Sequence, residues 1–202
     1  FTSCVHRRGP IPVQCQLGSR HCARFNPAMK SVAPTRKASQ VGTLFNLLGP
    51  LVNPALPPNQ LLGVANLGLM RLYAQVFQAL GMEFAVVTSL DGYDEISLTN
   101  EFKVIMRHYE RIYRPEEMGI PSLQPQELFG GHTPQEAARI FDNVLNNCAT
   151  GPQKDCVLYN AAFAIQILEP QKRIDECTAI ARESLESGKA LATLKKFIDL
   201  NS

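Results

Sequence analysis

Leu61-Leu62-Gly63-Val64-Ala65 and Phe84-Ala85-Val86-Val87 are two short apolar runs that frame the stretch deciding the fold. Apolar, partly β-branched runs between turn residues predict buried strands. Between them, Asn66 can cap a helix and Gly81 can end it. The apolar positions at helical spacing are Leu69, Leu72, Tyr73, Val76, Phe77 and Leu80. A strand, a helix and a strand in this order predict two parallel strands joined by a right-handed crossover.

The rest of the chain extends this unit. Residues 101–106 alternate well enough to predict another strand. Thr133-Pro134-Gln135-Glu136 has the pattern of a capping box with proline at the first helical position, so it predicts the start of an amphipathic helix. Three more helices are predicted over residues 155–168, 174–187 and 190–198. The fold class that follows is α/β, with a mixed, partly parallel sheet and flanking helices.

A group of carboxylates follows the second apolar run, in the stretch Leu90-Asp91-Gly92-Tyr93-Asp94-Glu95-Ile96-Ser97. Ligands of open α/β sheets bind at the carboxyl ends of strands. Mg²⁺ is usually held by one or two carboxylates together with substrate phosphates. We therefore predict that Asp94 and Glu95 bind Mg²⁺. The alternative is that Asp91-Gly92 is only a turn and that these acids are solvated loop charges.

Charge is divided unevenly along the chain. The formal net charge is +2, yet the first acidic residue is Glu83, and eight basic residues precede it. A cationic segment beside carboxylates that can hold Mg²⁺ favours a polyanionic small substrate such as a sugar pyrophosphate. Nucleic acid is the rival partner, but the basic residues lack both helical spacing and interleaved aromatic residues. We expect no nucleic-acid partner.

Length and composition favour a globular chain. With 202 residues and 45% hydrophobic content, it can build one sizeable core. Since no apolar run approaches the ~18 residues of a membrane span and the start lacks a signal pattern, we expect a cytoplasmic location without a membrane partner. The six cysteines are too sparse for a disulfide framework. Zinc binding by Cys4, His6, Cys15, His21 and Cys22 is disfavoured, because short Cys-x-x-Cys pairs are missing.

Three separated motifs carry a family resemblance. They are Asn26-Pro27-Ala28-Met29-Lys30-Ser31-Val32-Ala33-Pro34-Thr35-Arg36-Lys37, Thr43-Leu44-Phe45-Asn46-Leu47-Leu48-Gly49-Pro50-Leu51-Val52-Asn53-Pro54, and residues 91–97. In this order they closely resemble bacterial anthranilate phosphoribosyltransferases, over roughly residues 25–202. The resemblance implies a nucleoside phosphorylase/phosphoribosyltransferase-like fold. It also implies transfer of the phosphoribosyl group of phosphoribosyl pyrophosphate to the amine of anthranilate, a step of tryptophan synthesis, with Mg²⁺ as cofactor.

Residue roles follow from the same resemblance. It places the carboxylate of anthranilate on Arg36, whose planar guanidinium matches a carboxylate. It places Asn26 and Pro50 beside the anthranilate and the metal on Asp94 and Glu95. It requires no catalytic side chain. Two positions depart from the family pattern: Asn26 stands where the family has a histidine, and Gly42 stands where it usually has an arginine. An amide still forms hydrogen bonds, but it carries no proton at neutral pH.

Parts of the family pattern do not occur in this sequence. The family has a small helical domain, through which it can form homodimers, and two phosphate-binding loops, Gly-Thr-Gly-Gly-Asp and Lys-His-Gly; neither loop motif is present here. We therefore predict an atypical, poorly ordered segment over residues 1–24, followed by a partial catalytic domain over residues 25–202. The alternative function is a non-catalytic fragment that folds without its phosphate loops. A nucleoside phosphorylase of related architecture fits the loop around Arg36 less well.

Overall fold

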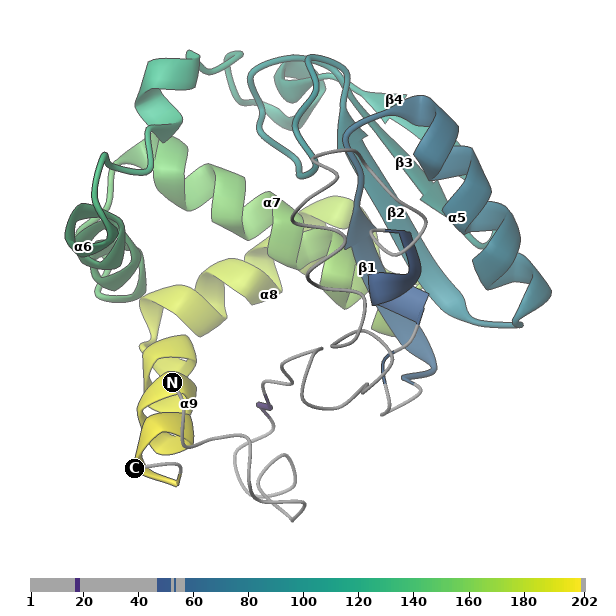
Figure 1. Cartoon of the computed structure of the whole chain (residues 1–202). Helices are drawn as coiled ribbons and strands as arrows, with labels where there is room; N and C mark the ends of the chain where they lie inside the picture. The colour runs from purple at the N-terminus through teal and green to yellow at the C-terminus, as the bar shows by residue number, and fades with distance from the viewer. Residues whose placement is uncertain (1–16, 19–46, 52, 54–56, 201–202) are drawn as a thin grey trace, which may run out of the picture. The chain divides into compact units, whose positions relative to one another are not determined.

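A computed structural model describes residues 17–18, 47–51, 53 and 57–200 of the chain (Figure 1). Two compact units are present: one is Pro58–Ala190, and the other combines Phe1–Pro57 with Leu191–Ser202. The predicted division into residues 1–24 and 25–202 stays a prediction, because most of the first 57 residues lie outside the described part.

The larger unit is built on a four-stranded mixed sheet in the order β1-β2-β3-β4 (Figure 1). The strands are β1 (Asn59–Gly63), β2 (Glu83–Ser89), β3 (Phe102–Met106) and β4 (Glu110–Tyr113). β1 pairs with β2 in parallel, whereas β2–β3 and β3–β4 are antiparallel. The predicted parallel pair and the mixed, partly parallel sheet are confirmed. Gly63 lies opposite Val87, so β1 and β2 end at the same edge.

Helices cover both faces of this sheet. α5 (Leu67–Ala79) packs on one face and α7 (Gly151–Leu168) on the other, with α8 (Ile174–Glu186) packed against α7 (Figure 1). The other helical segments of this unit are η3 (Pro115–Met118), η4 (Pro125–Leu128) and α6 (Pro134–Leu145). η2 (Gly49–Leu51) belongs to the smaller unit. The first two residues of α9 (Lys189–Asp199) are assigned to the larger unit and the rest to the smaller one.

The main core fills the space between the sheet and α7. Phe102 and Tyr113 stack at 5.4 Å between ring centroids, and Phe163 of α7 meets the edge of Tyr113 at the same distance. On the opposite face, Phe77 of α5 packs on Phe84 at 5.5 Å. Burial of each such side chain contributes ~1.5–3 kcal/mol. Aromatic side chains therefore pack on both faces of the sheet.

The buried face of α5 differs from the predicted one. The structure buries Met70, Tyr73, Ala74 and Phe77, whereas Leu72 is 46% and Leu80 61% exposed. Leu72 and Leu80, which the sequence places among the apolar positions of this helix, therefore lie outside its buried face. The buried set keeps the i, i+3, i+4, i+7 spacing of one helix face, but that spacing starts at Met70.

Helix starts follow the local cap chemistry. Thr133 caps α6 as predicted, accepting a hydrogen bond from the Glu136 amide at 3.2 Å, but the Glu136 carboxylate bonds to the His132 amide and not to that of Thr133. α7 begins at Gly151, earlier than predicted. Thr150 and Gln153 form its capping box. This Thr-x-x-Gln signal is readable in the sequence.

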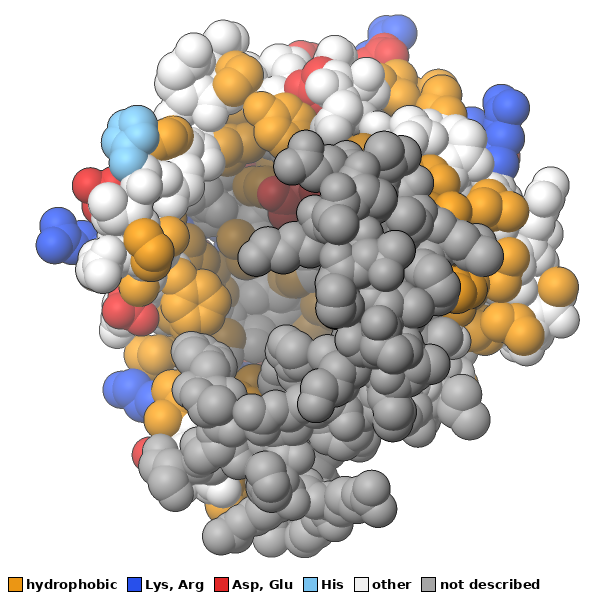
Figure 2. Space-filling model, in the orientation of Figure 1, with side chains coloured by type: hydrophobic (Ala, Val, Ile, Leu, Met, Phe, Trp, Pro, Cys, Tyr) orange, Lys and Arg blue, Asp and Glu red, His pale blue; other side chains and the backbone are white. Residues whose placement is uncertain are grey.

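Some hydrophobic side chains remain on the surface of the larger unit. They include Leu72 and Leu80 on α5 and Phe141 on α6, and Figure 2 shows orange side chains over both helices. Within the described residues, no helix is both long and apolar enough to cross a membrane.

Candidate metal and substrate site

The predicted carboxylates lie on the loop that joins β2 to β3. β2 ends at Ser89, and Asp91, Asp94 and Glu95 follow on the exposed part of the loop. Neither the Asp94 carboxylate nor the Glu95 carboxylate forms a hydrogen bond or an ion pair with another described residue, whereas the Asp91 carboxylate accepts a hydrogen bond from Thr99. Among the described residues, these two neighbouring carboxylates thus have no partner, and they lie at the edge where β1 and β2 end.

Hydroxyl groups hold the base of this loop together. Ser89 donates its hydroxyl proton to the Glu95 carbonyl at 2.7 Å and accepts hydrogen bonds from the amide and the hydroxyl of Ser97 at 3.1 and 3.0 Å. Ser97 also bonds to Thr99 at 2.7 Å between their oxygens. Ser89 and Ser97 are both buried, so these hydroxyl groups satisfy one another inside the protein.

Backbone constraints reinforce the loop. Gly92 has φ of 102°, and its amide donates to the Ser89 carbonyl at 3.0 Å, closing the turn that the sequence predicts. Leu98 has φ of 61°, which an L-residue rarely adopts, and its side chain is fully buried. Because the burial of Leu98 fixes a costly backbone conformation, the loop has one defined path.

Gly63 lies directly against this loop. A Cβ atom added to Gly63 would come within 1.6 Å of the Asp94 carbonyl oxygen. No side chain fits in that space. The end of β1 therefore supports the backbone of a predicted metal ligand.

We predict that Gly63→Ala displaces the loop at Asp94. Overpacking of a rigid site costs ~1–3 kcal/mol, so the melting temperature should fall. Thermal unfolding followed by circular dichroism measures it. Gly130→Ala is the matched control, because a Cβ atom there meets nothing within 4 Å. Equal melting temperatures for Gly63→Ala and Gly130→Ala would contradict the close approach.

α7 contacts the loop from the other side. Asn160 accepts a hydrogen bond from the Ile96 amide at 3.1 Å and donates one to the Ile96 carbonyl at 2.8 Å. The Cys156 thiol donates to the same carbonyl at 3.1 Å. Burial, and to a lesser degree the nearby negative charge of Glu95, raises the pKa of Cys156 to about 12.

The raised pKa of Cys156 gives a pH prediction. An unfolded thiol ionises near pH ~8.5, whereas the folded one keeps its proton up to about pH 12. Between these values unfolding releases a proton, so the free energy of unfolding should fall as the pH rises. Urea unfolding from pH 8 to 11 should show a steeper fall for the wild type than for Cys156→Ala. An equal fall of the free energy of unfolding with pH in both proteins would contradict the raised pKa of Cys156.

The described residues do not supply a complete metal site. No group of three or more His, Cys, Asp or Glu side chains in the described part is placed to hold a metal ion. Two free carboxylates without a third protein ligand suit a cation such as Mg²⁺, which keeps several waters and takes further oxygen ligands from a phosphate. The residues present fit Mg²⁺ in this way.

The other predicted site residues are not brought to this loop by the described structure. Pro50 lies in η2 and is half-buried in the smaller unit. Arg36 and Asn26 lie outside the described residues, as does Gly42. Their roles stay predictions.

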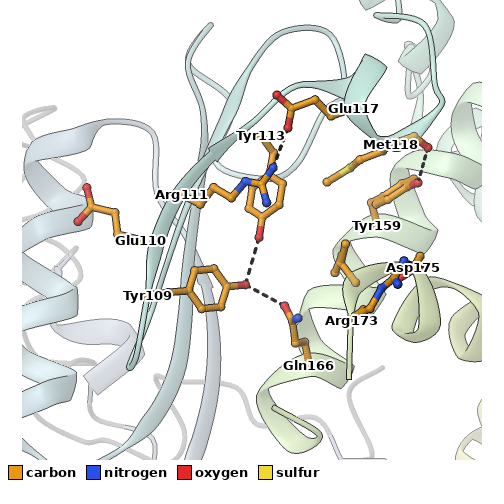
Figure 3. A pocket seen from close by; sticks show the side chains of 11 residues that line it. Tyr109, Glu110, Arg111, Tyr113, Glu117, Met118, Tyr159, Gln166, Arg173 and Asp175 are labelled. Carbon is orange, nitrogen blue, oxygen red and sulfur yellow. Dashed lines mark hydrogen bonds and ion pairs between the residues drawn. The ribbon is translucent and has the colours of Figure 1, made fainter. Parts of the chain in front are cut away.

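A separate cleft of about 760 Å³ lies between β4, η3, α7 and α8 (Figure 3). Tyr113 donates its hydroxyl to that of Tyr109 at 3.3 Å, and Tyr109 donates to Gln166 at 2.9 Å. Burial, with Tyr113 as a smaller cause, raises the pKa of Tyr109 well above its ordinary value. Because these polar groups satisfy one another, they form a structural network rather than an obvious ligand site.

Sequence reasoning missed three residues that shape the carboxylate loop: Gly63, Ser89 and Asn160. Gly63 belongs to a predicted strand and Asn160 to the predicted helix over residues 155–168, and neither prediction places them at the loop. A glycine at the end of a strand is the one local signal for a close backbone approach. Nothing local identifies Asn160.

The fold and the exposed carboxylates at the strand ends define an α/β domain with a candidate cation site. The chain belongs to the glycosyl transferase family, a/b domain, whose model matches residues 20–191. Relatives named anthranilate phosphoribosyltransferase confirm the predicted resemblance. The one from Phocaeicola vulgatus is 66% identical over 189 residues, which are 94% of this chain and 57% of that protein. The one from Bacteroides thetaiotaomicron is 58% identical over 202 residues, 100% of this chain and 61% of that protein.

Solved structures of proteins with the same name also match this chain. Anthranilate phosphoribosyltransferase from Thermus thermophilus matches with a TM-score of 0.84 and 33% identity, covering 92% of this chain and 56% of that one. The enzyme from Saccharomyces cerevisiae in complex with PRPP and Mg matches with a TM-score of 0.76 and 30% identity, covering 85% and 49%. The chain thus spans about three-fifths of the length of these curated relatives and about half that of these solved structures.

Proposed function

We propose that this chain takes part in the transfer of a phosphoribosyl group from phosphoribosyl pyrophosphate to the amine of anthranilate, as in tryptophan synthesis. The observation that carries the proposal is the pair of free carboxylates, Asp94 and Glu95, on a fixed loop in a chain of this family. Relatives with this name, and a yeast neighbour solved with PRPP and Mg, support it.

Asp94 and Glu95 would hold Mg²⁺ together with the pyrophosphate of the sugar substrate. When bound, Mg²⁺ neutralises the negative charge that develops on departing pyrophosphate. The role of the chain is then to present two carboxylates in a fixed direction and to align the amine with the ribose carbon. No side-chain nucleophile is needed, because the amine itself attacks as pyrophosphate leaves.

Arg36 would orient anthranilate through its carboxylate, with Asn26 and Pro50 beside the ring. This assignment rests on the motif around residues 26–37 and on the fit of a guanidinium to a carboxylate. Asn26 in place of the family's histidine removes a group that titrates near neutral pH, so binding through this position should vary little between pH 6 and 8.

We predict that Arg36→Ala weakens anthranilate binding by ~1.5–3 kcal/mol, because one charge-assisted bidentate contact is lost. Anthranilate fluorescence, titrated in the presence of Mg²⁺ and phosphoribosyl pyrophosphate, measures it. Arg71→Ala on α5 is the control, because it removes an exposed arginine from another part of the chain. Wild-type affinity in the Arg36→Ala variant would mean that the carboxylate is held elsewhere.

A further inference from the structure

Three consecutive residues of the carboxylate loop are held by three different elements. The Asp94 carbonyl rests against Gly63 at the end of β1. The Glu95 carbonyl accepts the Ser89 hydroxyl of β2 at 2.7 Å. The Ile96 amide and carbonyl both bond to Asn160 of α7, at 3.1 and 2.8 Å. The backbone that carries the two carboxylates is therefore held at three successive residues, while the carboxylates stay exposed.

We propose that Asn160 is a positioning residue for the Asp94–Glu95 metal site. The inference rests on the proposed function, since it concerns how the same two carboxylates are held. Asn160 lies on a helix far from the loop in sequence. Its task is to fix the backbone at Ile96, directly after Glu95.

The chemistry of the side chain suits this task. An amide carries both a donor and an acceptor, so Asn160 can satisfy both backbone groups of Ile96 at once, as a neighbouring strand would. The side chain of Ile96 is fully buried, so its backbone groups need partners inside the protein. An ionised carboxylate only accepts hydrogen bonds, so it could not serve the Ile96 carbonyl.

Asn160 is itself held in place. Its amide nitrogen also donates to the Cys156 carbonyl at 2.9 Å, one turn earlier on α7. Cys156 in turn donates its thiol to the Ile96 carbonyl. Both side chains that bond to Ile96 therefore belong to a helix that packs against the sheet, not to another loop.

A fixed backbone matters because Mg²⁺ demands near-ideal octahedral geometry. Residues that orient metal ligands without touching the metal change affinity by ~10–100-fold when they are replaced. We expect an effect of this size from Asn160, and none from an asparagine that does not contact the loop.

The test uses the whole chain with Asn160→Leu, which keeps the branched shape of the side chain but removes both hydrogen bonds to Ile96, and Asn160→Ala, which leaves room for water and should fold more readily. Asn143→Leu on α6 makes the same change outside the loop and serves as the control. Two readouts are compared: hydrogen exchange of the Ile96 amide without ligand, and calorimetric titration with Mg²⁺ in the presence of phosphoribosyl pyrophosphate.

Both Asn160 variants should speed exchange at Ile96 at least tenfold while β2 amides stay protected, and should weaken Mg²⁺ binding ~10–100-fold. At saturating Mg²⁺ both variants should still bind as many ions per chain as the wild type. A variant that was partly unfolded would bind fewer. Variants that bind Mg²⁺ as the wild type does would overturn the positioning role and leave the proposed function standing. A wild-type chain that binds no Mg²⁺ while Asn160→Ala still frees the Ile96 amide would instead overturn the proposed function.

Discussion

The purified 202-residue polypeptide, mixed with anthranilate, phosphoribosyl pyrophosphate and Mg²⁺, should consume anthranilate slowly or not at all. The family resemblance places most of the phosphate-binding groups on Gly-Thr-Gly-Gly-Asp and Lys-His-Gly loops, and neither motif occurs in these 202 residues. Removal of a single preorganised donor from a site costs ~10²–10³ in rate, and several are involved here. The loss of anthranilate fluorescence follows the reaction.

The Bacteroides thetaiotaomicron relative, of which this chain spans 61%, is the reference enzyme for that assay. Under equal conditions its rate should exceed that of the 202-residue polypeptide by at least ~10²-fold, the cost of one lost donor. A rate within tenfold of the reference would contradict the expectation, and it would show that the carboxylate loop and the residues around Arg36 carry most of the catalysis.

The second large effect is expected at the carboxylate pair. Asp94→Asn with Glu95→Gln should abolish the uptake of Mg²⁺ that accompanies phosphoribosyl pyrophosphate. Neutral amides keep the size of the side chains but remove both negative charges, and hard cations bind charged oxygen ligands. Because the constraints at Gly63, Ser89 and Asn160 act on the backbone and not on the carboxylates, the loop should keep its path in the variant.

Asp142→Asn on α6 is the matched control, because it neutralises an exposed carboxylate far along the chain from the loop. Calorimetry should show normal Mg²⁺ uptake for this control. Melting temperatures of all three proteins should agree within a few degrees. If the doubly substituted protein took up Mg²⁺ normally, the two acids would be solvated loop charges, as the spacing alone also allowed.

Much of the fold could be predicted because its signals are local. The apolar runs around Leu62 and Val86, the cap at Asn66 and the stop at Gly81 lie within one short stretch. The structure has a strand at each run and a helix between them, although β1 ends at Gly63 and not at Ala65. The face of α5 could not be predicted as well. Leu72 and Met70 are both apolar, and only the sheet that packs on the helix decides which one is buried.

The candidate site also combines features that the local sequence predicts with contacts that it does not. The carboxylates and the turn at Gly92 are visible in sequence, because a strand, a glycine and acids follow one another. The constraints on their backbone are tertiary: Asn160 and Ile96 lie 64 positions apart, and nothing in either neighbourhood identifies the other. Arg36 and Asn26 lie outside the described residues, so their place beside the metal site stays a prediction from the family motif.

Crystals of the chain grown with Mn²⁺ and phosphoribosyl pyrophosphate would test the central claim most directly. Mn²⁺ accepts the same oxygen ligands as Mg²⁺, and its anomalous scattering locates it without ambiguity. The claim predicts an anomalous peak about 2 Å from carboxylate oxygens of Asp94 and Glu95, with the remaining ligands from pyrophosphate and water. A peak at another acidic group, with Asp94 and Glu95 facing solvent, would contradict it.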